Sequence, residues 1–314
     1  MMYGPGSASI TPSVVSPPRV PTNVDIVRRQ FGHRAQRLAA RDVLLREVAA
    51  RMLDRLSYIR LAPRRILDLG CGLGRARAPL LERYDGAEWL GVDLAEPLVR
   101  AGRAEVNAAR RGFARWRATR SESIVADAAR LPIADDSVEL IFSNLMLNWH
   151  PSPHTVFPEW RRVLTVNGLL MFSTLGPDTL KELRSAASAA LPHAAPLPFV
   201  DMHDFGDMML ASGFATPVMD VETLTLTYET PRDLIADVRA LGGNPRGDRW
   251  PALVSGAQAR CLYARLDALR GRDGRIPLTF EVAYGHAWKP AARARPVPSI
   301  ALETVRSELA QRRR

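Results

Sequence analysis

The chain has 314 residues, 46% of them hydrophobic and 24% charged, so it is long enough to bury a sizeable core. It has no run of about 18 apolar residues to cross a bilayer and only two cysteines, which argues against a disulfide framework, so we expect a soluble protein of the reducing cytoplasm. The formal net charge of +10 favours acidic or phosphorylated partners: nucleic acid, an anionic membrane surface or an acidic carrier protein.

The first 60 residues divide into two parts. Residues 1–23 are rich in Pro, Ser and Thr and lack acidic side chains, which predicts a disordered tail. Residues 24–60 are predicted to be helical, because Val48, Met52, Leu56 and Ile59 recur at helical spacing behind Asp42, a candidate N-cap. One face of this segment is expected to pack on the rest of the protein.

From residue 64, short apolar runs alternate with helical stretches, which predicts a mostly parallel sheet with helices on both faces. The predicted strands are 64–70, 88–94, 123–128, 138–147, 169–176, 221–228 and 278–288. The last two alternate in the manner of an antiparallel pair at a sheet edge, and residues 231–273 between them are expected to form a helical insertion. The fold class is therefore α/β, with a Rossmann-like, mostly parallel seven-stranded sheet over residues 61–290. Residues 291–314 form a predicted tail or helix.

A glycine-rich turn follows the first strand. Asp68 precedes Gly70, Gly72 and Gly74, whose missing side chains permit a sharp bend and close approach to a ligand before a helix. A triphosphate loop is excluded because the turn continues LGRA without the Lys and Ser/Thr that it needs, and the dinucleotide fingerprint is weakened because its third glycine is Arg75. S-adenosylmethionine suits the spacing best, because Asp68 would favour its amino group and sulfonium.

Two further acidic residues follow the next strands. Asp93 ends the second strand, where a carboxylate accepts hydrogen bonds from ribose hydroxyls, and Asp127 beside Ala128 ends the third, within reach of an adenine amine. Carboxyl ends of adjacent parallel strands share one crevice, so the set predicts a nucleoside-type cofactor. The candidate cofactor-binding residues are Asp68, Gly70, Cys71, Gly72, Gly74, Asp93, Leu94, Asp127, Ala128 and Ser143. We expect Cys71 to be a small buried residue in this turn, not a nucleophile.

The successive segments DLGCGLG, LGVDL, VADAARLPIADDSVELIFSNLMLNW and RRVLTVNGLLMFST resemble the motifs of class I S-adenosylmethionine-dependent methyltransferases. The chain is more specifically similar to the malonyl-acyl-carrier-protein O-methyltransferases that start biotin synthesis. This similarity includes Phe31 and Gly32, STLGPDTLKELR, FVDMHDFGDMMLASGFATPVMD, ALGGN and GRIPLTFEVAYGHAW, and it spans roughly residues 25–290. The respiratory complex I assembly methyltransferases, which modify an arginine, share some of these features and are the nearest alternative.

Two positions depart from the biotin family. Its members commonly have a tyrosine soon after the phenylalanine of an N-terminal lid, whereas residues 31–57 contain no tyrosine and Leu38 stands near that place. Asn148 stands where relatives usually have histidine, and His150 follows Trp149 instead. We expect His150 to lie at the surface before Pro151.

The resemblance implies methyl transfer from S-adenosylmethionine to the free carboxylate of a malonyl thioester. A carboxylate is ionised at neutral pH, so the chemistry needs alignment and exclusion of water instead of a general base. Asn144 and Trp149, at the end of the fourth strand, are the candidates for positioning the reactants, with local packing as the alternative for Trp149. The N-terminal helical segment would form a lid over the crevice.

A basic stretch is the candidate surface for substrate or carrier protein. Its residues are Arg110, Arg111, Arg115, Arg117 and Arg120, around Phe113 and Trp116 in ARRGFARWRATR. Such a patch would speed encounter with an acidic carrier protein, although a solvated insertion and an RNA-binding surface are alternatives. Arg239 in the insertion is an alternative docking position. We expect a monomer and no resident metal, since the six histidines lack ligand spacing, and we do not expect nucleic acid or a membrane as partner. A protein that binds an NAD-like nucleotide without methyl transfer remains the alternative outside the methyltransferases.

Overall fold

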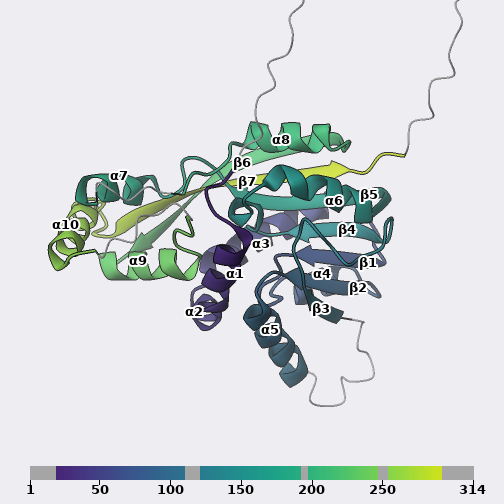
Figure 1. Ribbon diagram of the computed structural model, residues 1–314, viewed down its shortest axis with the longest axis horizontal. Coiled ribbons are helices and arrows are strands. Elements are labelled where there is room, and N and C mark those ends of the chain that lie inside the picture. Colours follow the sequence, from purple (N-terminus) through teal and green to yellow (C-terminus); the bar gives the residue numbers. More distant parts are fainter. Residues whose placement is uncertain (1–18, 110–120, 192–196, 247–253, 292–314) are drawn as a thin grey trace, which may run out of the picture.

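A computed structural model describes residues 19–109, 121–191, 197–246 and 254–291. Its centre is a seven-stranded sheet with the order β3-β2-β1-β4-β5-β7-β6, in which β7 alone runs against the other six (Figure 1). The strands are β1 (Arg65–Leu69), β2 (Glu88–Asp93), β3 (Ser121–Val125), β4 (Val138–Ser143), β5 (Leu164–Leu175), β6 (Ala215–Tyr228) and β7 (Ile276–Trp288). The predicted α/β fold is confirmed. The reversed strand β7 lies one place in from the edge, which β6 forms.

The strand order changes direction at β1, which pairs with β2 on one side and β4 on the other. Asp68 is aligned with Gly91 of β2, and Asp93 with Val125 of β3. The carboxyl ends of β1, β2 and β3 therefore meet at the same end of the sheet, beside the switch point where α/β proteins bind ligands.

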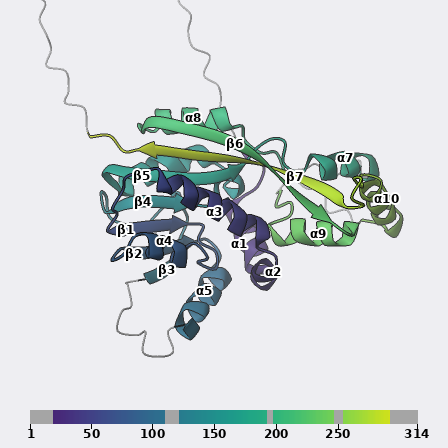
Figure 2. The same ribbon diagram turned by 180° about the vertical axis from the view of Figure 1, so that it is seen from behind.

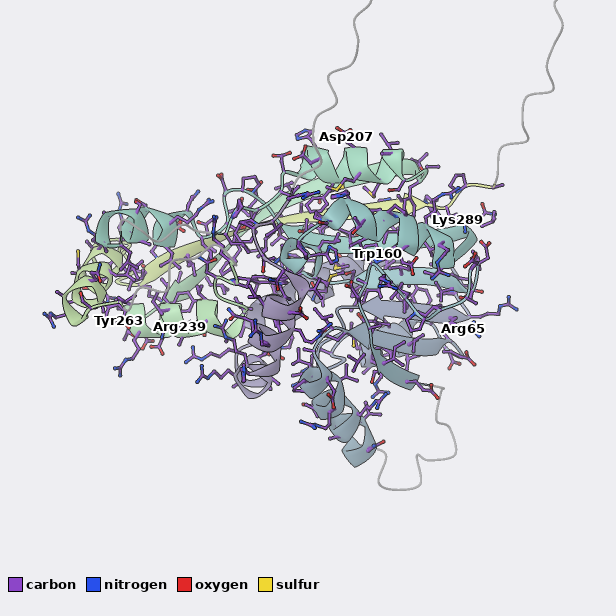
Figure 3. All side chains as sticks on the ribbon, in the orientation of Figure 1. Arg65, Trp160, Asp207, Arg239, Tyr263 and Lys289 are labelled. Carbon is purple, nitrogen blue, oxygen red and sulfur yellow. The ribbon has the colours of Figure 1, made fainter. Side chains whose placement is uncertain are left out.

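Helices cover both faces of the parallel strands. On one face, α6 (Val156–Val163) and α8 (Met202–Ala211) bury Phe157, Trp160 and Phe205 against Phe172 of β5; Figure 3 labels Trp160. On the other face, α3 (Val43–Ser57) and α4 (Arg77–Arg83) pack against the strand side chains that point to that side of the sheet, such as Ile66. The helix α5 (Glu96–Ala109) packs on β2 and β3. Helices thus cover both faces of the sheet with apolar contacts. The carboxyl ends of the parallel strands are not covered in this way and face the N-terminal helices.

The N-terminal segment forms three helices: α1 (Val24–Gly32), α2 (Ala35–Ala40) and α3. Asp42 occupies the N-cap position of α3 as predicted, but its side chain makes no capping hydrogen bond. Its carboxylate instead pairs with Arg46 at 2.9 Å and with Arg75 at 3.2 Å. Asp42 thereby ties the start of α3 to the residue that follows the glycine turn.

The strands β6 and β7 extend beyond the parallel strands and carry α7 (Lys181–Ala190), α9 (Pro231–Ala240) and α10 (Gly256–Asp267), as Figures 1 and 2 show. Local signals start the last two helices, since Thr230 caps α9 and a capping box of Ser255 and Gln258 opens α10. The turn after α9 reaches back to α1, where the side-chain amide of Gln30 donates to the carbonyl of Gly242 at 2.6 Å. Within the described ranges, no helix has the length and apolarity needed to cross a membrane.

Candidate active site

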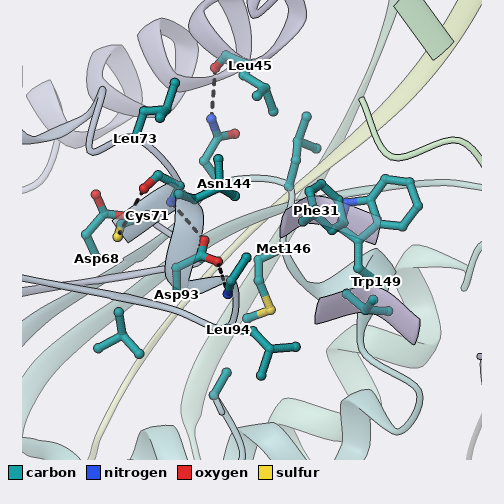
Figure 4. A pocket seen from close by; sticks show the side chains of 18 of the residues that line it. Phe31, Leu45, Asp68, Cys71, Leu73, Asp93, Leu94, Asn144, Met146 and Trp149 are labelled. Carbon is teal, nitrogen blue, oxygen red and sulfur yellow. Dashed lines mark hydrogen bonds between the residues drawn. The ribbon is translucent and has the colours of Figure 1, made fainter. Parts of the chain in front are cut away.

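A cavity lies where the carboxyl ends of β1, β2 and β4 meet the N-terminal helices (Figure 4). Ten of the predicted site residues line it: Asp68, Gly70, Cys71, Gly72, Asp93, Leu94, Asp127, Ala128, Asn144 and Trp149. Gly74, Ser143 and Arg239 are not among its lining residues. The basic stretch with Arg110, Arg111, Arg115, Arg117 and Arg120 lies outside the described residues.

The glycine turn permits close contact between backbone and ligand. Gly70 has φ +70° and Gly72 has φ +53°, and a Cβ on Gly70 would lie 2.5 Å from the Met146 side chain. The N–H groups of Gly70 and Cys71 both donate to the carbonyl of Val92, at 2.8 and 3.0 Å. These two N–H groups are already bonded to Val92 and cannot donate to a ligand. The turn therefore helps a ligand to bind through the space that its glycines leave.

Asp68 is a buried carboxyl group with one unpaired oxygen. The residue is 2% exposed, and Oδ2 has no hydrogen-bond partner among the described residues. Burial raises the pKa of Asp68 to about 7, an effect that the indole of Trp89 opposes and the charge of Asp93 increases. A ligand with an amino group or a sulfonium would neutralise this carboxylate and supply its missing partner.

Asp93 is held by the backbone. Its Oδ2 accepts the N–H of Gly72 at 2.9 Å, and its Oδ1 accepts the N–H of Ala95 at 2.8 Å. Burial raises the pKa of Asp93, and these hydrogen bonds oppose the shift. Each carboxylate oxygen retains a lone pair, so Asp93 is oriented in advance for the hydroxyls of a ribose.

Asp127 is paired with His150. The His150 Nε2 lies 3.5 Å from Asp127 Oδ1, which also accepts the N–H of Ala129 at 2.9 Å. The pair with His150 lowers the pKa of Asp127 below its ordinary value, so this carboxylate is ionised at neutral pH. The expectation of a surface position for His150 is wrong: its side chain is 10% exposed and lines the cavity.

Asn144 connects three elements beside the cavity. Its side-chain amide donates to the carbonyl of Leu45 in α3 at 2.8 Å, and its oxygen accepts the hydroxyl of Ser173 in β5 at 2.9 Å. Ser143, fully buried next to it, donates its hydroxyl to the carbonyl of Leu69 at 2.9 Å. Asn144 therefore fixes α3 to the end of the sheet, and Ser143 links the ends of β4 and β1.

Trp149 closes one side of the cavity together with the N-terminal helices. Its ring meets Phe31 of α1 edge to face, with centroids 5.4 Å apart. Gly242 fits against both rings, because a Cβ there would lie 2.5 Å from Trp149 and 3.0 Å from Phe31. Leu38, at the place where the resemblance implies a tyrosine, is 6% exposed and also lines the cavity. This wall is apolar.

Sequence reasoning placed the methyl-transfer pocket at residues 143–150, which include the lining residues Met146 and His150, but it did not identify Arg28 and Leu241. Met146 and His150 flank Trp149 closely in the sequence, so the end of β4 carries a signal for them. Arg28 and Leu241 approach the cavity through the packing of α1 and α9, and no local pattern predicts such contacts.

The comparisons with known proteins agree with this geometry. Residues 67–172 match the family model of the methyltransferase domain. A malonyl-acyl-carrier-protein O-methyltransferase from Gallionella capsiferriformans is 42% identical over 268 residues, which cover 85% of this chain and 91% of that protein. The enzyme of the same name from Laribacter hongkongensis is 44% identical over 278 residues, which cover 87% and 92%. The chain belongs to the malonyl-acyl-carrier-protein O-methyltransferase family.

Solved structures support the fold of this family member. The YcgJ protein of Bacillus subtilis, 15% identical, superposes with a TM-score of 0.55 over 79% of this chain and 100% of its own. The methyl donor of the methyltransferase is S-adenosylmethionine. The orphaned oxygen of Asp68, the oriented Asp93 and the glycine turn fit a molecule that combines a cationic amino acid with a nucleoside.

Proposed function

We propose that the chain transfers a methyl group from S-adenosylmethionine to the free carboxylate of malonyl-acyl-carrier protein, or of malonyl-coenzyme A, at the start of biotin synthesis. The observation that carries this proposal is the similarity of 42–44% identity over more than four fifths of the chain to enzymes named for that substrate. The same cavity that holds the acidic residues for the cofactor continues to Asn144 and Trp149.

We propose distinct roles for the lining residues. Asp68 pairs with the cationic methionine portion of the cofactor, Asp93 accepts hydrogen bonds from the ribose, and Asp127 accepts one from the adenine amine. S-adenosylmethionine supplies a methyl group activated by its sulfonium. The malonyl carboxylate forms the new O–C bond while the C–S bond breaks, and the electron pair of that bond stays on sulfur.

The chain needs no general base for this reaction, because the acceptor carboxylate is ionised at neutral pH. Its contribution is to align the acceptor oxygen with the methyl carbon and to keep water from stabilising the carboxylate. The rings of Phe31 and Trp149 supply an apolar wall for that purpose, and Asn144 holds α3 in place over it. We propose that α1, α2 and α3 act together as the lid of the cavity.

The location and the oligomeric state are part of the proposal. We place the enzyme in the cytoplasm, where Cys71 and Cys261 would stay reduced; both are free in the structure. We propose that the enzyme is a monomer. Light scattering during gel filtration measures the mass, and a stable dimer would contradict this part.

Incubation with radiolabelled S-adenosylmethionine tests the activity. The expected result is label in the malonyl methyl ester when malonyl-carrier protein or malonyl-coenzyme A is supplied. Label found only in polypeptide or RNA would instead support a methyltransferase of the respiratory-complex assembly type. Calorimetric titration with S-adenosylmethionine and NAD separates both from a nucleotide-binding protein without methyl transfer. A growth test, in which the chain restores biotin independence to cells lacking their own enzyme, checks the pathway.

A further inference from the structure

Three arginines lie where α2 meets α9 without a carboxylate partner among the described residues. Arg34 precedes the first residue of α2, Arg37 lies within α2, and Arg239 lies in the last turn of α9 (Figure 3 labels Arg239). Arg37 and Arg239 each lie close enough to Arg34 to repel it: burial lowers the pKa of Arg34, and the charges of Arg37 and Arg239 lower it further. We call these residues the arginine cluster.

The same contact between helices neutralises a fourth arginine. Arg41, at the end of α2, pairs with Asp237 and lies 3.6 Å from Asp233, both in α9. The contact between α2 and α9 therefore includes acidic partners for the arginine that holds the helices together. Among the described residues the arginine cluster receives no such partner, so its positive charge is available to an anionic ligand.

Arg34 shows the strongest sign of a missing partner. Its Nη1 is buried and makes no hydrogen bond within the described residues. The guanidinium lies against the turn after α9, because a Cβ on Gly243 would lie 2.8 Å from Nη1. Burying a charged donor without an acceptor is unfavourable, and an anion bound beside Arg37 and Arg239 would offset that cost.

The position of the cluster decides which anion fits. Gly242 faces Trp149 and Phe31 in the cavity wall, whereas the next residue, Gly243, faces Arg34. Arg34 is not among the residues that line the cofactor cavity. The carboxylate that accepts the methyl group must lie inside that cavity, so a second anionic group of the substrate, farther from the reacting atoms, is the one that meets the arginines.

We propose that Arg34, Arg37 and Arg239 bind the phosphate at the far end of the pantetheine arm of the acyl substrate. This inference rests on the proposed function, because a malonyl thioester on carrier protein or on coenzyme A has such a phosphate. Guanidinium groups hold phosphate oxygens through paired, charge-assisted hydrogen bonds. The arm then enters between α2 and α9 and passes the turn at Gly242 and Gly243 to present its thioester to the cavity.

Steady-state kinetics with three substrates tests the proposal: malonyl-carrier protein, malonyl-coenzyme A and malonyl-pantetheine, which lacks the phosphate. The variants are Arg34→Gln, Arg37→Gln and Arg239→Gln. The matched control is Arg232→Gln, which removes an exposed charge from the opposite end of α9. The expected result is a KM raised about three- to tenfold for the two phosphate-bearing substrates and unchanged for malonyl-pantetheine, with kcat and cofactor affinity unchanged.

Other outcomes overturn the proposal. An equal loss on all three substrates would make the cluster a structural element of the lid, and a loss on carrier protein alone would assign it to acidic side chains of that protein. Arg37 and Arg239 are exposed, so replacing them should not prevent folding. Their variants therefore still test the proposal if Arg34→Gln fails to fold. If the wild type methylates none of the three substrates, the proposed function itself fails, and the proposal falls with it.

Discussion

The His150 Nε2 lies 3.5 Å from Asp127 Oδ1, which joins the chain after β4 to the chain after β3. The backbone N–H of Ser152 donates to His150 Nδ1 at 3.2 Å, so the proton of the neutral ring is on Nε2 and faces Asp127. The hydrogen bond from Ala129 and the approach of the imidazole both involve Oδ1, and Oδ2 has no partner among the described residues. Asp127 is thus oriented before the cofactor binds.

The variant His150→Phe is expected to weaken cofactor binding about fivefold, because Asp127 loses the polar imidazole that lies beside its carboxylate. Calorimetry with S-adenosylhomocysteine measures this change. S-inosylhomocysteine, which lacks the adenine amine, serves as the control ligand: its affinity should change less. Equal losses for the two ligands would contradict a role of Asp127 at the amine.

Cofactor affinity is expected to fall as the pH is lowered through about 7. In the free enzyme burial raises the pKa of Asp68 to about 7, so the carboxyl is neutral below that pH. The cationic ammonium group of the ligand pairs with the ionised carboxylate, and the affinity should therefore approach a tenfold loss for each further pH unit. Titrations of S-adenosylhomocysteine between about pH 5 and pH 8 test this.

The matched variant for this pH effect is Asp68→Asn. It should bind S-adenosylhomocysteine weakly, and its affinity should not change near neutral pH. It should also be more stable than the wild type without ligand. The raised pKa of Asp68 means that the stability of the wild type falls as the pH rises from the unfolded value near 4 to about 7. A step near pH 7 that persists in Asp68→Asn would assign the titration to another group.

The variant Asp93→Ala is expected to raise the Kd for the cofactor by more than about tenfold, because ribose recognition and the alignment of Gly72 are both lost. The unfolding midpoint should change little by comparison, since no apolar core contact is removed. Calorimetry and thermal unfolding measure the two effects. An unchanged Kd would refute the ribose role.

The variant Gly242→Ala is expected to reduce stability by about 1–3 kcal/mol and to lower activity, because its methyl group would press on Trp149 and Phe31. Gly274→Ala is the control for positive φ, since Gly274 has φ +73° and nothing within 4 Å of an added Cβ. Denaturant unfolding compares the two variants. Similar losses in both would mean that backbone conformation, not the aromatic contact, explains the glycine at position 242.

The sequence predicts those parts of the site that can be recognised within one short stretch of the chain. Asp68, Asp93 and Asp127 follow runs that are recognisable as strands, and the strand order then places them together. Asn144 was chosen as a positioning residue, yet its partner Leu45 lies 99 residues earlier in the chain. Such a pairing depends on how α3 packs on the sheet, which no local pattern specifies.

The same limit applies to the wall of the cavity. Phe31 and Trp149 meet only because α1 folds across the end of β4, and the turn at Gly242 joins them from a segment inserted between β6 and β7. The extended character of β6 and β7 could be predicted from their alternation. Their contact with the site through the inserted turn could not.

The far halves of β6 and β7 set the inserted helices apart from the donor end of the sheet. Mutations in α9 and α10 do not change the acidic residues proposed for the nucleoside. The position of α9 still affects the rings of Trp149 and Phe31, because the turn at Gly242 packs against them. Substitutions in this one protruding module can therefore change which acceptor is bound, while the residues that bind the methyl donor stay the same.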